Sequence, residues 1–281
     1  MNDSYLIGLD AGTTSVKGLL ISVNGSSETV VQKEYSIEYR EGGIVELNPE
    51  IYWETTLFII NQLLTRSGVK PEKIRAISFA SQGETLIAID KDGKPLRNAI
   101  VWLDNRSEEE AKTIEQTFTR QILLEKTGQP EILPIWPATK ILWLKNNEPG
   151  IFRKTGKFLL VEDYLIYKLT GHYYSEESLA SSTLYFDIRK KKWWDEMVDF
   201  LHISPQLLPK VLPSGSATGK ISTEAAAATG LCADTIIVTG AYDHAAGAIG
   251  SGNIREGIIS ETTGASMAMV VTTDDPVLNP T

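Results

Sequence analysis

Short apolar runs alternate with turn-forming residues over the first part of the chain. Residues 5–9 and 16–23 are largely apolar, and the segment between them consists of small and turn-forming residues. This pattern predicts two antiparallel strands joined by a tight loop. The dipeptide Asn24-Gly25 is a strong turn signal, and we expect a third strand over residues 29–39 after it.

Helical periodicity begins after these strands. Asn48 can cap a helix over residues 49–67, which starts with a proline at the favoured first position and repeats apolar residues at a spacing of three or four. Ser107, with a glutamate three residues later, predicts a capped helix over residues 107–124. Further helices are predicted over residues 137–146, 161–169, 224–229 and 243–250.

Apolar runs between the helices predict additional strands. Residues 74–81 and 235–239 are expected to be buried strands, and residues 86–90 are expected to pair with a strand near Ala99. Strand structure is predicted to resume from Gly257. Strands with helices between them indicate the α/β class.

The composition is that of a globular protein with an acidic surface. The chain has 281 residues and a formal net charge of −9, which argues against nucleic acid and anionic membrane as partners because both need basic patches. The one cysteine, Cys232, and three scattered histidines offer no disulfide framework or metal-ligand spacing. No apolar run approaches the ~20 residues of a membrane helix, and no leader pattern precedes the first strand. We therefore expect a cytoplasmic protein.

The first candidate functional segment is the loop between the first two strands. Residues 10–15 read Asp-Ala-Gly-Thr-Thr-Ser, and Lys17 follows. Backbone N–H groups in such a loop can point at phosphate oxygens, and the hydroxyls add donors. Asp10, at a strand end, can hold Mg²⁺ through water. The glycine and lysine spacing of a P-loop is absent, and an ordinary hairpin turn would explain the same residues.

Two further segments carry groups suited to a polyol. Glu84 lies two residues after Gln82, at the end of a predicted buried strand, where a carboxylate can accept hydrogen bonds from sugar hydroxyls. Trp102, Asp104 and Arg106 are spaced by two, so on an extended segment they share one face. The ring would cover C–H groups while the charged groups bond hydroxyls. A solvent-facing glutamate and a core tryptophan beside an ion pair are the structural alternatives.

The last candidate is Asp243, which begins the predicted helix over residues 243–250. The N-terminus of a helix stabilises a carboxylate in its charged form. A plain N-cap aspartate is the structural alternative. His244 beside it is expected to serve helix packing or capping.

Together these segments resemble, in order and spacing, the FGGY family of carbohydrate kinases. Residues 164–171 and 179–187 resemble structural segments of that family, so the likeness covers essentially the whole chain. It implies an α/β, actin-like ATPase (ribonuclease H-like) domain of a two-domain sugar kinase. Residues 1–254 would form this domain, and residues 255–281 would be the beginning of a truncated second domain, which in the family holds adenosine.

The resemblance also implies roles for single residues. Asp243 would be the catalytic base, and Asp10 the metal ligand. Residues 260–267 resemble the second phosphate loop, although Ala265 stands where many relatives carry threonine. The implied ATP-binding residues are Asp10, Gly12, Thr13, Thr14, Lys17, Thr263 and Gly264. The implied sugar-binding residues are Gln82, Glu84, Trp102, Asp104, Arg106 and Asp243.

The function implied is ATP-dependent phosphorylation of a sugar hydroxyl, with ATP and Mg²⁺ and a ketopentose such as xylulose as acceptor. A glycerol or erythritol kinase is the alternative within the family. Gly83 replaces an arginine of the glycerol kinase pattern and predicts room for a longer polyol beside Glu84. An actin-like ATPase switch protein and a non-catalytic sugar-binding module are alternatives of other classes. We expect the isolated chain to be inactive as a kinase, with a homodimer left open.

Overall fold

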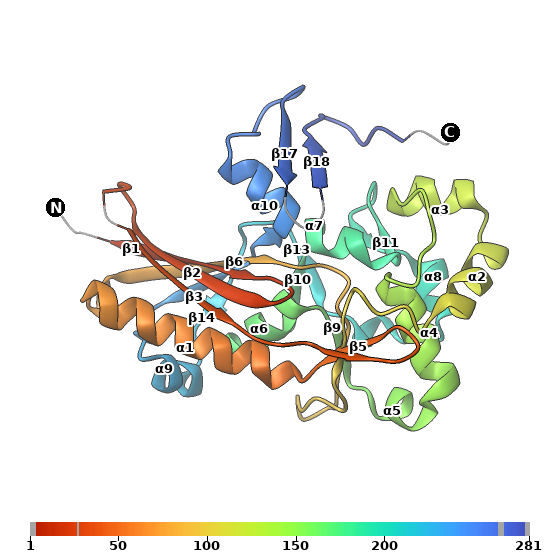
Figure 1. Cartoon of the computed structure of the whole chain (residues 1–281), viewed down its shortest axis with the longest axis horizontal. Helices are drawn as coiled ribbons and strands as arrows, with labels where there is room; N and C mark the ends of the chain where they lie inside the picture. Colours follow the sequence, from red (N-terminus) through yellow and green to blue (C-terminus); the bar gives the residue numbers. More distant parts are fainter. Residues whose placement is uncertain (1–3, 27, 264–266, 279–281) are drawn as a thin grey trace.

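A seven-stranded sheet is the central element of the molecule (Figure 1). The structure is a computed structural model, and it describes residues 4–26, 28–263 and 267–278. The strand order is β14-β15-β6-β1-β2-β3, and β16 also pairs with β6. The first three strands form an antiparallel meander, whereas β1, β15 and β16 run parallel to β6. The strands are β1 (Tyr5–Ala11), β2 (Ser15–Ser22), β3 (Glu28–Glu34), β6 (Ile74–Ser81), β14 (Ala217–Lys220), β15 (Ile236–Val238) and β16 (Ala241–Tyr242).

The predicted meander is confirmed, but its third strand is shorter than expected. β3 ends at Glu34, and Tyr39 belongs to a separate strand, β4 (Glu38–Arg40). The chain leaves the sheet because Tyr35 bonds back to the first loop: its backbone N–H donates to Thr14 O at 2.9 Å, and its hydroxyl donates to Gly12 O at 2.5 Å. Because β3 ends early, Tyr35 can hold the first loop in place through these two bonds.

One face of the sheet is covered by helices. The long helix α1 (Pro49–Ser67) packs on β2 and β3, and α6 (Val161–Thr170) and α9 (Thr223–Thr229) pack beside it. The predicted cap of α1 is confirmed, because the Asn48 side chain accepts from Glu50 N at 3.1 Å. Apolar side chains from these helices and the sheet form one hydrophobic core.

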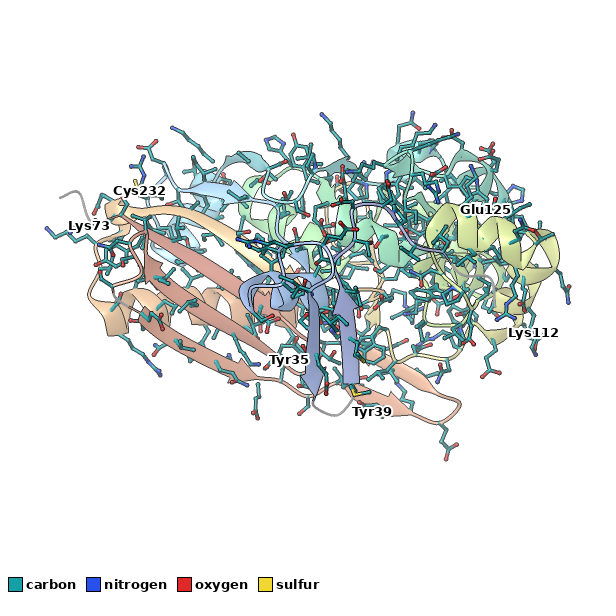
Figure 2. All side chains as sticks on the ribbon, turned by 90° about the horizontal axis from the view of Figure 1, so that it is seen from above. Tyr35, Tyr39, Lys73, Lys112, Glu125 and Cys232 are labelled. Atoms are coloured by element: carbon teal, nitrogen blue, oxygen red, sulfur yellow. The ribbon has the colours of Figure 1, made fainter. Side chains whose placement is uncertain are left out.

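A second hydrophobic core lies at the other end of the molecule, among helices. Figure 2 shows β1–β3 at one end and α2 and α3 at the other. The helices outside the sheet layer are α2 (Glu108–Thr117), α3 (Arg120–Thr127), α4 (Pro137–Asn147), α5 (Pro149–Lys154), α7 (Glu177–Ala180), α8 (Asp195–Phe200) and α10 (Asp243–Gly250), with 3-10 turns at Pro71–Lys73, Ser181–Thr183 and Pro205–Leu207.

The single helix predicted over residues 107–124 is wrong. The helix is interrupted at Phe118, between α2 and α3. The backbone of Phe118 is extended, and its ring packs edge-on against Trp194 and Phe200. Ser107 does not cap α2 with its side chain. Its hydroxyl instead donates to Pro134 O at 3.0 Å and lies 2.8 Å from the Thr139 hydroxyl. Tertiary contacts override the local capping signal here.

Several small sheets join these layers. Leu86 forms a bridge with Ile100 and Ile89 with Pro95, so the predicted pairing near Ala99 is present. The strands β7 (Ile87–Ile89) and β8 (Ala99–Ile100) pair mainly with β9 (Lys157–Leu159) and β5 (Ile44–Leu47). The hairpin β17–β18 follows α10 and confirms the strand expected after Gly257. In the described part of the chain no helix is long and apolar enough to cross a membrane. The remaining strands are β5 (Ile44–Leu47), β7 (Ile87–Ile89), β8 (Ala99–Ile100), β9 (Lys157–Leu159), β10 (Tyr174–Glu176), β11 (Phe186–Asp187), β12 (Lys192–Trp193), β13 (Lys210–Leu212), β17 (Ile259–Thr263) and β18 (Met267–Val271).

Candidate active site

The sheet topology brings three of the sequence-predicted segments to one edge. β1, β6 and β16 are parallel, so their carboxyl ends meet at the same edge of the sheet. Asp10 lies near the end of β1, Glu84 follows β6, and Asp243 follows β16. In open α/β sheets, ligands bind in the crevice outside these strand ends. The edge is therefore the candidate active site.

The first loop is fixed to the other predicted segments by hydrogen bonds. The indole Nε1 of Trp102 donates to Thr13 Oγ1 at 2.8 Å, and the side chain of Gln82 donates to Gly12 O at 2.9 Å. Gln82 is buried, and its amide also donates to the Tyr52 hydroxyl at 3.1 Å. Gln82 thus supports the loop from inside, while Thr14 stays exposed.

Three carboxylates lie at this edge. Burial raises the pKa of Asp10, the Lys17 ammonium lowers it, and repulsion from Asp243 raises it again. Burial raises the pKa of Glu84 to about 7; the Lys140 ammonium opposes this rise, and Asp243 adds to it. Asp243 thus influences both of the other carboxyls electrostatically. Such a group of acids with raised pKa values is typical of a functional site.

Glu84 is held in an unusual backbone conformation. Its φ is +56°, in the left-handed region that non-glycine residues seldom occupy, and only 7% of the residue is exposed. A backbone of this kind persists where its surroundings hold it in place, and it recurs at binding sites. The Lys140 ammonium donates to the carbonyl oxygen of Glu84 at 2.8 Å.

The position of Gly83 corrects the expectation of free space beside Glu84. A Cβ added at Gly83 would lie 2.8 Å from both Ser182 Oγ and a ring carbon of Tyr242. The absent side chain of Gly83 therefore makes way for Ser182 and Tyr242 and opens no room for a longer substrate. These two neighbours, which the sequence did not single out, are the side chains that shape this flank of the site.

Asp243 begins α10, as predicted. Its Oδ1 accepts from the backbone N–H of His244 at 2.6 Å, and burial raises its pKa while His244 lowers it. The His244 ring lies edge-on to Tyr242, with 5.2 Å between the centroids, which is consistent with helix packing. A partly buried aspartate with a raised pKa has the properties of a proton acceptor near neutral pH.

A buried cluster of acids holds the segment that leads to Asp243. Glu162 in α6 accepts from Gly240 N at 2.7 Å. Ser178 Oγ accepts from Tyr242 N at 3.0 Å and donates to Glu176 at 2.7 Å. Gly240 must be glycine, because an added Cβ would lie 1.8 Å from the carbonyl oxygen of Phe79. The segment from Gly240 to Tyr242 therefore packs closely against β6, and hydrogen bonds fix both of its ends.

The acids of this cluster lack cationic partners among the described residues. Glu162, Asp163 and Glu176 are fully buried, and within the described residues no cation is paired with any of them. Burial raises the pKa of Glu162 well above its usual range, and that of Asp163 to about 7; Glu176 adds repulsion to both. Glu162 Oε2 is buried without a hydrogen-bond partner in the part of the chain that is described. A neutral, protonated Glu162 fits these surroundings.

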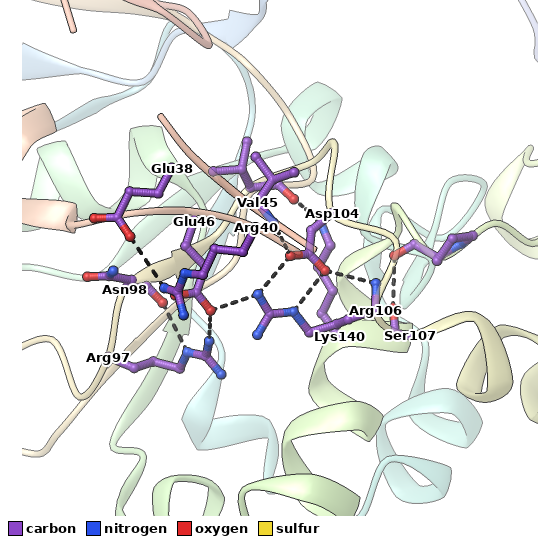
Figure 3. A network of polar contacts seen from close by, with 12 residues as sticks. Glu38, Arg40, Val45, Glu46, Arg97, Asn98, Asp104, Arg106, Ser107 and Lys140 are labelled. Carbon is purple, nitrogen blue, oxygen red and sulfur yellow. Dashed lines mark hydrogen bonds and ion pairs between the residues drawn. The ribbon is translucent and has the colours of Figure 1, made fainter. Parts of the chain in front are cut away.

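Asp104 and Arg106 occupy a different environment from the one predicted. Residues 102–106 form a turn instead of an extended segment, and Asp104 is completely buried. Its two oxygens accept from Val45 N at 2.6 Å and from the Arg106 guanidinium at 2.7 and 2.8 Å. Arg106 also pairs with Glu46 at 2.7 Å (Figure 3). Asp104 and Arg106 thus form the structural ion pair that was the alternative to sugar binding. Both carboxylate oxygens of Asp104 already accept hydrogen bonds within the protein.

The remaining predicted residues concern ATP and Mg²⁺. Lys17 is exposed beside the first loop. The side chain of Thr263 and all of Gly264 lie outside the described residues. Among the residues described, no group of three or more His, Cys, Asp or Glu could hold a metal by itself. Asp10 fits Mg²⁺ nonetheless, because this ion is usually bound by one or two carboxylates together with water and substrate phosphates.

Comparison with known proteins identifies the class. The profile of the FGGY family of carbohydrate kinases, N-terminal domain, matches residues 5–250. The chain therefore belongs to the FGGY family of carbohydrate kinases. The crystal structure of gluconate kinase from Lactobacillus acidophilus matches with a TM-score of 0.89 and 31% identity, over 95% of this chain and 54% of that one. The expected actin-like α/β fold is confirmed.

Relatives within the family carry different names. A xylulose kinase from Staphylococcus xylosus is 31% identical over 96% of this chain and 56% of its own length. A glycerol kinase from Thermococcus kodakarensis is 34% identical over 98% of this chain and 55% of its own length. The chain thus spans about half the length of these curated relatives. Their names agree on a kinase and differ on the acceptor.

Sequence reasoning predicted residues of the candidate site but missed the residues that support them. Lys140, Glu162 and Glu176 contact the backbone of the predicted segments through hydrogen bonds, directly or through one serine. Their only sequence signal is position: Lys140 lies within an otherwise largely apolar stretch, residues 137–144. A polar residue inside such a stretch is a candidate for a buried bond, since it must be satisfied there.

Proposed function

We propose that the full-length protein phosphorylates a sugar hydroxyl with Mg·ATP, and that the acceptor is a ketopentose such as xylulose. The observation that supports this most strongly is the convergence of Asp10, Glu84 and Asp243 from three parallel strand ends beside the first loop. Acids at this edge can serve a metal-bound phosphate, a polyol and a proton transfer at the same time.

Asp243 acts as the general base in this proposal. It accepts the proton of the attacking hydroxyl, a role for which a raised pKa is suited because the base must hold a proton near neutral pH. Glu84 accepts hydrogen bonds from the sugar, and the half-buried face of Trp102 covers its C–H groups. Gly12, Thr13 and Thr14 surround the phosphates, with Lys17 nearby. Mg²⁺ at Asp10 would neutralise charge on the phosphates.

Asp104, Arg106 and Gln82 support the site without touching the sugar. The Asp104–Arg106 pair fixes the turn that carries Trp102, and Gln82 fixes the first loop. The polar groups that we expected to bind the substrate are instead bonded to other residues of the protein. The boundary between two domains near residue 254, the cytoplasmic location and a homodimer stay predictions.

Glycerol is the second candidate acceptor. A relative named glycerol kinase is 34% identical, and Ser182 and Tyr242 fill the space beside Gly83 that would have favoured a longer polyol.

The test is a coupled assay of ADP release by the full-length protein with xylulose, ribulose, gluconate, erythritol and glycerol under one set of conditions. We expect sugar-dependent turnover, with the highest kcat/KM for a pentulose. If glycerol were the best substrate, the proposed acceptor would be wrong and the proposed kinase activity would stand. ATP turnover that no sugar stimulates would support the switch-protein alternative and reject the proposal. The 281-residue chain alone is expected to release no sugar-dependent ADP.

A further inference from the structure

A lysine is buried directly beneath the candidate sugar site. Lys140 lies in α4, and none of its surface is exposed to solvent. Lysines are almost never fully buried unless their ammonium group is satisfied by partners. The partners of Lys140 are two backbone carbonyl groups: its Nζ donates to Glu84 O at 2.8 Å and to Val101 O at 3.0 Å.

These two carbonyls belong to the two turns that carry the proposed sugar contacts. Glu84 supplies the first, in its left-handed conformation, and Val101 immediately precedes Trp102. Both carbonyls point into the protein toward α4, where an unpaired C=O costs about as much as a lost hydrogen bond. One ammonium group therefore joins the two turns from below.

Other bonds also join the two segments. Thr85 Oγ1 accepts from Trp102 N at 3.1 Å, and Leu86 exchanges backbone bonds of 2.9 Å with Ile100. Without Lys140 these bonds would still pair the segments, but the carbonyls facing α4 would lose their donor. The two peptide groups that carry these carbonyls would then be held less firmly relative to each other.

The charges around Lys140 come from both turns. Glu84 and Asp104 raise its pKa, whereas Arg106 and above all burial lower it, to about 7. The two bonds need only two N–H donors, which the charged and the neutral amine both have. The arrangement therefore persists across neutral pH.

We propose that Lys140 is a positioning residue for the sugar site: by bonding the carbonyls of Glu84 and Val101 it sets the distance between the Glu84 carboxylate and the Trp102 ring. This inference rests on the proposed function for its consequence in catalysis. Lys140 touches no reacting atom. The first loop, which serves ATP in the proposed function, has one bond to Trp102, from the indole to Thr13, and two other bonds, from Gln82 and Tyr35, that do not involve Lys140. Loss of Lys140 should therefore affect the sugar more than ATP.

The test uses Lys140→Met, which keeps the length of the side chain and removes the donors, with Lys157→Met as the matched control. Lys157 also donates from Nζ to two carbonyls, Gln206 O at 2.5 Å and Leu208 O at 3.2 Å. These two carbonyls are far in sequence from the proposed sugar contacts. Lys140→Gln retains a shorter donor and provides a second variant if the methionine variant does not fold.

Two readouts are measured on the full-length protein. Amide hydrogen exchange should rise in residues 83–86 and 101–104 of Lys140→Met, to a smaller extent in Lys140→Gln, and in neither segment of Lys157→Met. Steady-state kinetics should show a loss of roughly 10²-fold in kcat/KM for the sugar, as for a contact misplaced by about 1 Å, with the KM for Mg·ATP within about twofold of wild type.

The outcomes separate the two proposals. Unchanged exchange in the two segments, or equal losses toward sugar and Mg·ATP, would overturn the positioning role of Lys140. A wild-type protein that phosphorylates no sugar would reject the proposed function, and the exchange data would still decide whether Lys140 joins the two turns.

Discussion

Two buried polar regions support the candidate site, and they balance their charges in opposite ways. The region beneath Trp102 pairs Asp104 and Glu46 with Arg106, Arg97 and Arg40. The region beneath Asp243 buries Glu162, Asp163 and Glu176 together, and its hydrogen bonds come from backbone N–H groups and serines. A buried charge is tolerated when it is paired, whereas an unpaired acid takes up a proton instead. The two halves of the site should therefore respond oppositely to neutralisation and to pH.

The largest expected effect is in the paired region. Arg106→Met leaves the fully buried Asp104 carboxylate without its cation, and breaking a buried pair in this way typically costs about 3–5 kcal/mol. Urea unfolding of the wild type and the variant measures the difference. The variant Lys112→Met, which removes an exposed pair with Glu109, serves as the control and should stay within about 0.5 kcal/mol. Equal effects for both variants would show that Arg106 is not a buried partner.

The acid cluster is expected to tolerate neutralisation and to fail on truncation. Glu162→Gln replaces a protonated acid by an amide that can still accept from Gly240 N, so we expect a loss below about 1 kcal/mol. Glu162→Ala leaves that buried N–H without an acceptor, and we expect a loss of about 1–3 kcal/mol. The comparison is made by urea unfolding at pH 7. If the glutamine variant lost as much as the alanine variant, Glu162 would have to be charged in the folded protein.

The pH dependence of stability sharpens the same comparison. Asp163 has a pKa of about 7 in the folded protein against an ordinary value of 3.8, so between these values the folded protein holds a proton that the unfolded chain releases. The contribution of Asp163 to stability should fall as pH rises from about 4 to about 7 and then level off. The contribution of Glu46, whose pKa is lowered by its arginine partners, has the opposite sign and is lost as pH falls below the ordinary value of 4.5.

Asp163→Asn isolates the contribution of Asp163 to the pH dependence of stability. The variant should lower the slope of unfolding free energy against pH by up to about 1.4 kcal/mol per pH unit between pH 4 and 7, the value for one proton. Chemical denaturation at several pH values measures the slope. An unchanged slope would mean that Asp163 is ionised in the folded protein, and the contrast between the two regions would then be lost.

The sequence predicted the strands and loops of the site more successfully than its supports. β1, β6 and α1 have strong local signals. β1 begins with an apolar run, β6 alternates buried apolar residues with more exposed ones, and α1 follows Asn48 and starts with a proline. Phe118 carries no comparable signal for the break between α2 and α3, because that break depends on Trp194 and Phe200, far away in the sequence.

The same distinction holds within the site. Asp10, Glu84 and Asp243 could be predicted because each follows or ends a recognisable strand. The burial of Asp104 and Glu162 could not, because an acid in a turn or on a short helix looks like a surface residue until its distant neighbours are known. Gly83 was interpreted as empty space for the same reason: Ser182 and Tyr242, which occupy it, come from remote segments.

The measurement that tests the central claim most directly is turnover by Asp243→Asn in the full-length protein. If Asp243 is the general base, kcat for the sugar should fall by roughly 10²–10⁴, while calorimetry should show that sugar binding is retained, because Glu84 and Trp102 are unchanged. Turnover close to wild type would contradict the assignment of Asp243 and, with it, the account of the three strand ends as a phosphotransfer site.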